Sequence, residues 1–202
     1  MDAALRQLLE GLLESGRAHD AGRTDRLERL RNLEAETAQM LAVLVRATGA
    51  RRVLEIGTSN GYSALWLADA VADTGGEVTT VEVEPERARM ARENFGQSKL
   101  QHLIELRTED GGRTLAESPD GAWDFIFLDA ERPHYVGYWP DLVRSLRPFG
   151  LLAVDNVLSH AGEVAAFRAL VEGAPGITSA LVPIGAGVLL IAKGAGASGT
   201  RG

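Results

Sequence analysis

The segment from Val53 to Ser63, with the sequence VLEIGTSNGYS, constrains the fold more than any other part of the chain. An apolar run ends in a Glu-x-Gly turn at Glu55 and Gly57, and a second glycine, Gly61, follows four positions later. This order predicts a strand, a tight loop and the start of a helix. Because glycine lacks a Cβ, the backbone there can adopt positive φ and approach a ligand closely. The loop is therefore a candidate cradle for a nucleotide.

The same loop predicts the charge of its ligand. The N–H groups at a helix N-terminus and the helix dipole favour an anion, and Ser59, Asn60 and Ser63 add small hydrogen-bonding groups. A dinucleotide-binding turn reads G-x-G-x-x-G, whereas the spacing here is G-x-x-x-G. We therefore expect a nucleoside that carries a carboxylate rather than a dinucleotide.

From Arg52 onward, strand patterns alternate with helix patterns. Strands are predicted over 53–56, 78–83, 103–106, 125–128 and 151–154, and helices over 60–72, 85–95, 111–117, 135–146 and 161–172. Such alternation specifies a mostly parallel sheet with helices on both faces. Strands 177–182 and 188–192 have no helix between them, which predicts a closing antiparallel hairpin. Two helices, 3–18 and 33–48, precede the repeating part, so the chain is predicted to be an α/β protein.

Length and composition indicate one globular domain over residues 1–193. The chain has 202 residues, of which 45% are hydrophobic, enough for one well-filled core. Residues 1–48 are expected to cover the site or to form a dimer face. Residues 194–202 are mainly Gly, Ala and Ser, and a disordered tail is predicted there.

Several classes of partner and site are disfavoured. The chain has no cysteine, which excludes disulfides and thiolate metal ligands. It has no signal-peptide pattern and no apolar run of about 18 residues, so a cytoplasmic protein without a membrane partner is expected. A net charge of -7 argues against a nucleic-acid partner, which normally needs a basic face.

Four segments in this order and spacing carry a resemblance: Val53–Ser63, TTVEVEP over 79–85, FIFLDA over 125–130 and VDNV over 154–157. Over about residues 33–193 the chain resembles the catechol and caffeoyl-CoA O-methyltransferase group, including its small bacterial members. The resemblance implies a Rossmann-like class I methyltransferase fold with a seven-stranded, mostly parallel sheet. It also implies S-adenosylmethionine as methyl donor, a divalent cation such as Mg²⁺, and a homodimer.

The resemblance carries over to specific cofactor positions. Glu82 ends the second strand, where a carboxylate can accept hydrogen bonds from both ribose hydroxyls. Glu55 is implied to lie beneath the methionine part, although it could merely brace the glycine loop. Asp110 falls where the family contacts adenine, although it could equally cap a helix. The implied cofactor-binding residues are Leu33, Glu55, Gly57, Ser59, Gly61, Tyr62, Ser63, Glu82, Asp110, Gly111 and Asp129.

Three oxygen-bearing side chains form a candidate metal site. Asp129 ends the fourth predicted strand, Asp155 ends the fifth, and Asn156 follows it. Ligands of open α/β sheets sit at these carboxyl ends, so the three groups are expected to converge beside the methyl donor. Oxygen ligands of this kind suit a hard cation, which lowers the pKa of a bound hydroxyl. The alternative is that both aspartates merely cap loops.

The resemblance fails at one catalytic position. The family usually has a lysine three residues after the first metal aspartate, as the proposed general base, and this chain has Arg132. A guanidinium stays protonated, so Arg132 cannot take the proton, but it could stabilise a phenolate or hold an acidic group. His134 is the nearest titratable candidate base, and a surface loop histidine is the alternative. Glu131 is a candidate to assist the cation, as in the caffeoyl-CoA branch.

A second departure is the arginine-rich segment from Arg17 to Arg31, which could cover the acceptor, form a dimer face or be a solvated helix.

The chain as a whole is interpreted as a metal-assisted O-methyltransferase for a small hydroxylated acceptor, an aromatic with adjacent hydroxyls. Two alternatives stay open. One is a metal-independent methyltransferase in which Arg132 holds an acidic substrate, and the other is a non-catalytic protein that binds S-adenosylmethionine. The motif spacing disfavours a dinucleotide oxidoreductase, and the acidic balance disfavours an RNA methyltransferase.

Overall fold

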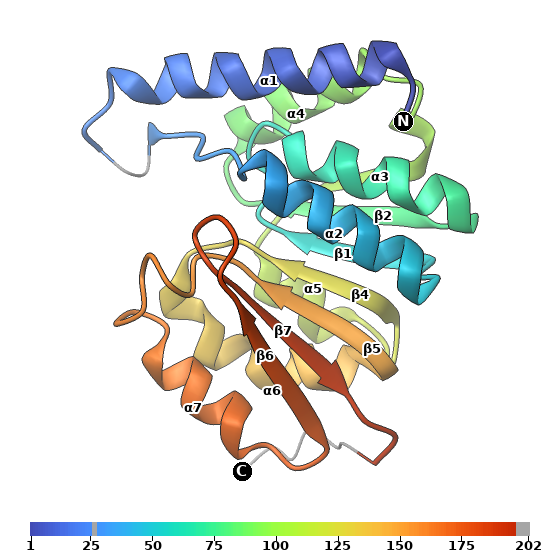
Figure 1. Ribbon diagram of the computed structural model, residues 1–202, viewed down its shortest axis with the longest axis vertical. Coiled ribbons are helices and arrows are strands. Elements are labelled where there is room, and N and C mark those ends of the chain that lie inside the picture. The colour runs from blue at the N-terminus through green and yellow to red at the C-terminus, as the bar shows by residue number, and fades with distance from the viewer. Residues whose placement is uncertain (26–27, 197–202) are drawn as a thin grey trace.

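The computed structural model describes residues 1–25 and 28–196 (Figure 1). Its strands are β1 (Arg52–Ile56), β2 (Glu77–Glu82), β3 (Ile104–Thr108), β4 (Trp123–Leu128), β5 (Leu146–Val154), β6 (Ile177–Val182) and β7 (Val188–Lys193). Its α-helices are α1 (Ala3–Ala21), α2 (Ala35–Thr48), α3 (Tyr62–Thr74), α4 (Pro85–Gly96), α5 (Gly111–Glu117), α6 (Tyr135–Ser145) and α7 (Ala165–Gly173). Two short 3₁₀ helices, η2 (Gln101–Leu103) and η3 (Arg132–His134), precede β3 and α6.

The strands form one seven-stranded sheet in the order β3-β2-β1-β4-β5-β7-β6. Strands β1 to β5 run parallel, and β7 is antiparallel to both of its neighbours, β5 and β6. The predicted parallel sheet with a closing antiparallel hairpin is therefore confirmed. Because β1 lies between β2 and β4, the strand order reverses there, and open α/β sheets bind ligands outside the carboxyl ends at such a point.

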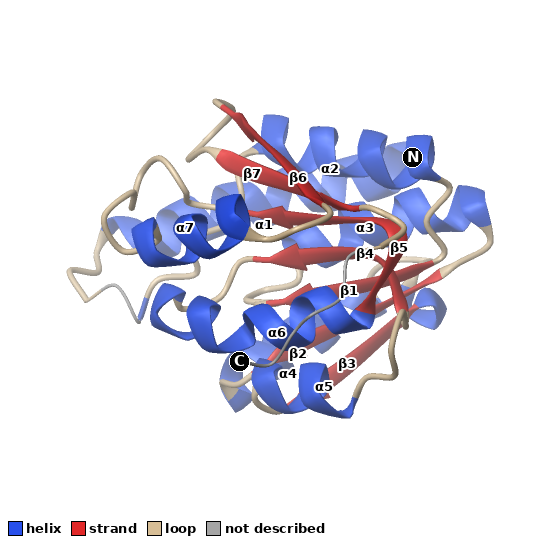
Figure 2. Ribbon diagram, turned by 90° about the horizontal axis from the view of Figure 1, so that it is seen from below, coloured by secondary structure: helices blue, strands red, loops and turns tan. Residues whose placement is uncertain are grey.

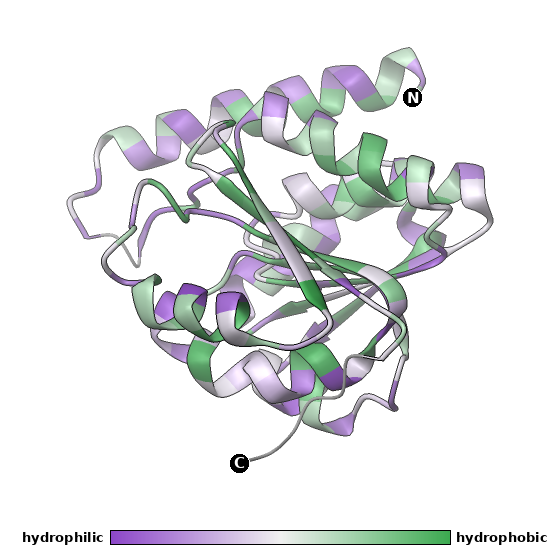
Figure 3. Cartoon of the chain, turned by 60° about the horizontal axis from the view of Figure 1, so that its bottom comes forward, coloured by the Kyte–Doolittle hydropathy of each residue, from purple (hydrophilic) through white to green (hydrophobic). Residues whose placement is uncertain are grey.

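Helices pack on both faces of the sheet, which lies as a layer between them (Figure 2). One buried cluster joins α1, α2 and α3 to one face through residues such as Leu41, Leu65 and Phe127. A second cluster joins α6 and α7 to the other face through residues such as Leu142 and Phe167. Hydropathy follows this layering, with apolar strands in the middle and polar residues on the outer sides of the helices (Figure 3). The sheet is thus a rigid platform whose carboxyl edge stays open.

Two boundaries differ most from the sequence prediction: β5 begins at Leu146 and not at 151, and α7 begins at Ala165 and not at 161. The early start of α7 in the prediction has a physical cause. The backbone N–H groups of Leu158 and Ser159 both donate to the carbonyl of Ala186 at 3.0 Å, and Val157 donates to Gly187. These donors are satisfied by the loop between β6 and β7, so the chain forms turns here before it enters the helix. The connection after β5 is thereby fixed against the hairpin.

Other boundaries agree to within a few residues. Helix α1 continues to Ala21, and α2 begins at Ala35. No helix within residues 1–25 and 28–196 is long and apolar enough to cross a membrane. Most of the tail for which disorder was predicted, 197–202, lies outside the described residues.

Candidate functional site

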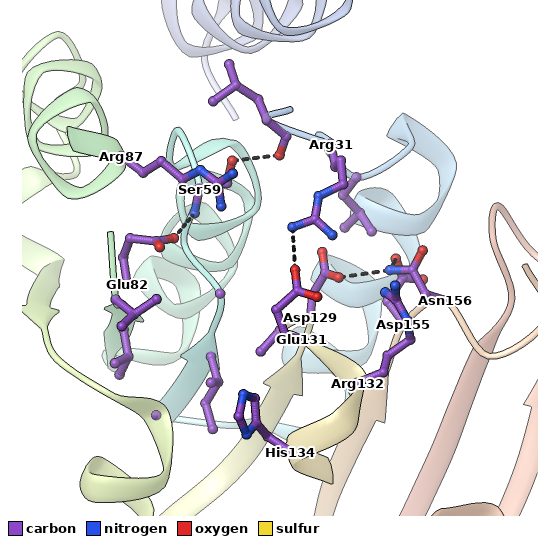
Figure 4. A pocket seen from close by; sticks show the side chains of 18 of the residues that line it. Arg31, Ser59, Glu82, Arg87, Asp129, Glu131, Arg132, His134, Asp155 and Asn156 are labelled. Carbon is purple, nitrogen blue, oxygen red and sulfur yellow. Dashed lines mark hydrogen bonds and ion pairs between the residues drawn. The ribbon is translucent and has the colours of Figure 1, made fainter. Parts of the chain in front are cut away.

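A cavity of about 470 Å³ opens at the carboxyl edge of the sheet (Figure 4). It is lined by the loops that follow β1, β2, β3, β4 and β5, by residues 30–34 between α1 and α2, and by Ala186 of the terminal hairpin. The cavity therefore lies at the reversal of strand order. Most residues that the sequence analysis singled out line it: Leu33, Gly57, Ser59, Glu82, Asp110, Gly111, Asp129, Arg132, His134, Asp155 and Asn156.

The glycine loop after β1 has the backbone conformation that its sequence predicts. Gly57 has φ +106°, and a Cβ built on it would lie 2.0 Å from the carbonyl oxygen of Asp129. Gly61 has φ +88°, and a Cβ there would meet the ring of Phe95 at 2.5 Å. Both positions therefore require glycine. The absence of a side chain at Gly57 lets the ends of β1 and β4 approach each other at the floor of the cavity.

Glu82, at the end of β2, presents a carboxylate to the cavity. Its side chain is almost fully buried, and its two oxygens accept hydrogen bonds from the backbone N–H groups of Ser59 at 2.8 Å and Glu84 at 3.0 Å. Each carboxylate oxygen can accept a further hydrogen bond. This fixed orientation is what recognition of a pair of vicinal hydroxyls requires.

Glu55 is fully buried and does not line the cavity. The Thr80 hydroxyl donates to its Oε2 at 2.5 Å, and the Thr58 and Thr80 hydroxyls are 2.6 Å apart. Burial raises the pKa of Glu55 to about 8. This geometry matches the bracing role, because Glu55 is linked through Thr80 to the glycine loop.

Gly61, Tyr62 and Ser63 also lie outside the cavity wall. All three belong to the start of α3, where Tyr62 and Ser63 are buried. Asp110 lines the cavity and also caps α5, because it accepts from the N–H groups of Gly112 at 2.9 Å and Arg113 at 3.2 Å. The position of Asp110 is thus compatible with both alternatives, a contact with adenine and a helix cap.

Asp129, Asp155 and Asn156 converge at one point. The Asn156 amide donates to Oδ1 of Asp129 at 2.9 Å and to Oδ2 of Asp155 at 3.1 Å. Oδ1 of Asp155 is buried and has no hydrogen-bond partner. Burial raises the pKa of Asp129 to about 6. Burial, reinforced by the charge of Asp129, raises the pKa of Asp155 to about 8.

The residues of this trio fit a hard cation. Asp155 is buried, has an orphaned oxygen and is disfavoured in its ionised form by the charge of Asp129, so a positive charge between the two carboxylates would relieve it. The amide orientation of Asn156 is an assignment, and a half-turn would direct its oxygen toward the carboxylates. Within residues 1–25 and 28–196, no group of three His, Cys, Asp or Glu residues is placed to hold a metal ion. The trio therefore depends on its amide as the third ligand.

Arg132 and His134 lie in different parts of the cavity. Arg132 is 2% exposed, and its Nε donates to Oε2 of Glu163 at 2.9 Å, while its Nη2 is buried without a partner. It lies beside Asp155 in Figure 4. His134 stacks on Tyr138, with ring centroids 5.8 Å apart and planes at 19°. Figure 4 shows His134 well apart from the trio.

Arg31 is one of several cavity residues that the sequence analysis did not single out. Arg31 belongs to the loop between α1 and α2, and its Nη2 donates to Oε1 of Glu131 at 2.9 Å across the cavity. The only sequence signal was the cluster of arginines that ends there. No local motif indicates which arginine of that cluster faces the site.

Comparison with known proteins agrees with this architecture. A family model described as O-methyltransferase matches residues 12–174. The chain belongs to the O-methyltransferase family. It is 36% identical over 163 residues to the mouse protein named catechol O-methyltransferase domain-containing protein 1, covering 76% of this chain and 62% of that one. The family predicted from the four sequence segments is confirmed.

Solved structures of the family share the fold. An O-methyltransferase from Bacillus cereus, in complex with S-adenosylhomocysteine, is 25% identical with a TM-score of 0.77, covering 96% of this chain and 91% of that one. The O-methyltransferase TomG from Streptomyces achromogenes, in complex with S-adenosylmethionine, is 25% identical with a TM-score of 0.76 and the same coverage. The predicted Rossmann-like methyltransferase fold is therefore confirmed.

Proposed function

We propose that this O-methyltransferase moves a methyl group from S-adenosylmethionine to a hydroxyl of a small aromatic acceptor with adjacent hydroxyls, assisted by a divalent cation. The observation that carries the proposal is the convergence of Asp129, Asp155 and Asn156 in the cavity that also holds Gly57 and Glu82. A donor site and a hard-cation site in one cavity suit direct transfer between two bound substrates.

Support for the methyl donor comes from the half of the cavity that Gly57, Glu82 and Asp110 line, here called the donor half. Glu82 has the fixed, buried carboxylate that a ribose requires, and Gly57 leaves room for close backbone approach. The related structures from Bacillus cereus and Streptomyces achromogenes hold S-adenosylhomocysteine and S-adenosylmethionine. We assign this half of the cavity to the nucleoside.

Support for the acceptor class comes from the trio and from a relative. Asp129, Asp155 and Asn156 would hold the cation, which would supply positive charge that lowers the pKa of an acceptor hydroxyl. Two adjacent hydroxyls match a site with several open oxygen positions. The mouse relative carries catechol in its name. The cytoplasmic location and the homodimer stay predictions.

In the reaction, the bond between sulfur and methyl breaks, a bond between acceptor oxygen and methyl forms, and the hydroxyl proton is released to water. Arg132 cannot accept that proton, and we do not assign the step to His134, because it lies apart from the trio. Arg132 instead adds positive charge beside Asp155, which partly offsets the rise in the pKa of Asp155 that burial causes. The residues of the site therefore orient the acceptor and stabilise its developing negative charge.

The test is methyl transfer from labelled S-adenosylmethionine to catechol-type acceptors, with Mg²⁺ and with a chelator. We expect the chelator to abolish transfer. Asp155→Asn should lower kcat at least about 100-fold, in the range that loss of metal assistance implies. The cofactor Kd, measured by calorimetry, should stay unchanged. Asp124→Asn, at the opposite end of β4, is the matched control. Transfer that persists with both the chelator and Asp155→Asn would contradict the metal role.

A further inference from the structure

Residues 29–33, here called the strap, cross the cavity between α1 and α2, and their backbone is held at several points. The Ser59 hydroxyl donates to the carbonyl of Leu30 at 2.7 Å, and the Arg87 guanidinium donates to the carbonyl of Arg29 at 3.0 Å. Asp20 accepts from the N–H groups of Leu30 at 2.7 Å and Arg31 at 2.9 Å. None of these bonds uses the Arg31 side chain, so the strap is held in place without it.

The backbone at Arg31 has a conformation that is uncommon for a residue with a side chain. Four non-glycine residues in the described part of the chain have positive φ, and three of them line the cavity: Arg31 at 52°, Ser59 at 49° and Asn156 at 65°. Such strain tends to persist at functional sites, where the surrounding structure enforces it. Anchoring by Asp20 thus directs the guanidinium of Arg31 into the cavity.

The Arg31 guanidinium lies between the donor half and the trio, pointing down from the strap in Figure 4. Its Nη2 pairs with Glu131 at 2.9 Å, and its Nε is buried without a hydrogen-bond partner. The two side chains are 34% and 31% exposed. Partly exposed ion pairs are weak, so a substrate carboxylate can compete for this guanidinium.

Arg132, the arginine that one alternative in the sequence analysis assigned to an acidic substrate, is less suited to that task. It is 2% exposed and already paired with Glu163. The aromatic residue of the cavity lining, Tyr138, lies with His134 and near Asp110, on the cofactor side. Among the described lining residues, those around the trio are mainly charged or polar, including Asn156, Ser159 and His160, and none is Phe, Tyr or Trp. Recognition there must come mainly from charged and polar groups.

We propose that Arg31 determines acceptor specificity by binding a carboxylate, so that the preferred acceptor is an acidic aromatic with adjacent hydroxyls and not a neutral catechol. The planar guanidinium fork matches a carboxylate in two parallel hydrogen bonds. The inference rests on the proposed function, since it names the acceptor of the same site. The acid binds between Arg31 and the trio and takes the place of Glu131 at the guanidinium.

The experiment compares each acid with its own methyl ester: 3,4-dihydroxybenzoate, and the longer 3,4-dihydroxycinnamate. The value of kcat/KM is measured with saturating S-adenosylmethionine and Mg²⁺. We expect the native enzyme to prefer at least one acid over its ester. In Arg31→Gln, kcat/KM for that acid should fall about 10- to 100-fold, mainly through KM, as expected for a lost charge-assisted bidentate contact. The value for the ester should change less than about twofold.

Two variants separate recognition from structure. Arg31→Lys keeps the charge without the fork and should retain part of the preference. Arg17→Gln removes an exposed arginine of α1 that does not line the cavity and lies outside the strap, and it should behave as the native enzyme does. Calorimetric binding of the acid with S-adenosylhomocysteine present should weaken by the same factor in Arg31→Gln, which gives a readout without turnover.

The outcomes distinguish this inference from the proposed function. Equal use of acid and ester in both pairs would overturn the role of Arg31 while the proposed function stands. An equal loss for acid and ester in Arg31→Gln would also overturn it, because it would indicate a structural role. Absence of both transfer and binding for all four compounds would overturn the proposed function together with the inference.

Discussion

The two halves of the cavity differ in how their residues are brought together. The donor half is built from consecutive strand ends, with Gly57, Glu82 and Asp110 following β1, β2 and β3. The acceptor half joins Arg31 to Glu131, which is 100 positions away in the chain. The donor half therefore depends on backbone geometry that local motifs encode. The acceptor half depends on side chains whose partners only the folded chain selects.

The largest effect is expected where the two halves meet, at Gly57. A Cβ there would lie 2.0 Å from the Asp129 carbonyl, and φ is +106°, so Gly57→Ala must displace β1 from β4. We expect a loss of several kcal/mol in the free energy of unfolding, on the order of 4 kcal/mol, with cofactor binding abolished. Denaturant unfolding and calorimetry measure both.

The matched control is Gly137→Ala on α6, where a Cβ would meet nothing within 4 Å. It should stabilise the helix by about 0.5–1 kcal/mol, because alanine restricts the unfolded chain and favours the helix. Native-like stability of Gly57→Ala would mean that the ends of β1 and β4 can move apart without loss, so the sheet would not be a rigid platform for the donor half.

The second prediction concerns the buried brace of the donor half, Glu55. Its pKa is raised from 4.5 to about 8 in the native state by burial, so between these values the native state holds a proton that the unfolded state has released. The free energy of unfolding therefore falls as pH rises from about 4.5 to about 8. In Glu55→Gln this contribution is absent.

The measurement is the difference in unfolding free energy between Glu55→Gln and the native protein. Between pH 5 and pH 8, the native protein should lose about 2–4 kcal/mol of unfolding free energy relative to Glu55→Gln, given 1.36 kcal/mol per pKa unit. Glu77→Gln, at an exposed position at the start of β2, should leave the difference constant. A constant difference for Glu55→Gln as well would mean that Glu55 is ionised in the native state.

Features that depend on local sequence patterns could be predicted from the sequence, and features that depend on contacts between distant segments could not. The strand and helix alternation, the hairpin and the family were all predicted, because period, glycine positions and strand-end acids are local patterns. The start of α7 was predicted too early, since Leu158 and Ser159 donate to Ala186 of a distant loop. No local pattern in residues 157–164 indicates that partner.

The candidate site shows the same division. The positions of Asp129, Asp155 and Asn156 in one cluster follow from strand ends that meet at one edge. Arg31 could not be singled out, because its direction depends on Asp20 and Glu131, which lie elsewhere in the chain. The proposed role of Arg31 in acceptor recognition is thus an inference that required the folded structure.

The third prediction tests the donor half without touching the acceptor half. Glu82→Gln keeps the shape of the side chain and loses its charge, so it should weaken cofactor binding about 10- to 100-fold, as for a hydrogen bond to a charged group. The acceptor KM and the dependence on Mg²⁺ should stay unchanged, measured at saturating cofactor. Glu84→Gln, an exposed neighbour, is the control. Loss of Mg²⁺ dependence in Glu82→Gln would show that the two halves are not separable.

The smallest effect is expected at Asp20, which holds the strap from α1 by accepting two backbone hydrogen bonds, from Leu30 and Arg31. In Asp20→Ala these donors turn to water, at a cost of about 1–2 kcal/mol. The strap then positions Arg31 less well, so the KM for the acid should rise about threefold to tenfold while the cofactor Kd stays constant. Glu14→Ala, exposed on the same helix, should change neither. A higher cofactor Kd in Asp20→Ala would mean that the strap also supports the donor half. The two halves would then be coupled through the contacts from Asp20 through Leu30 to Ser59.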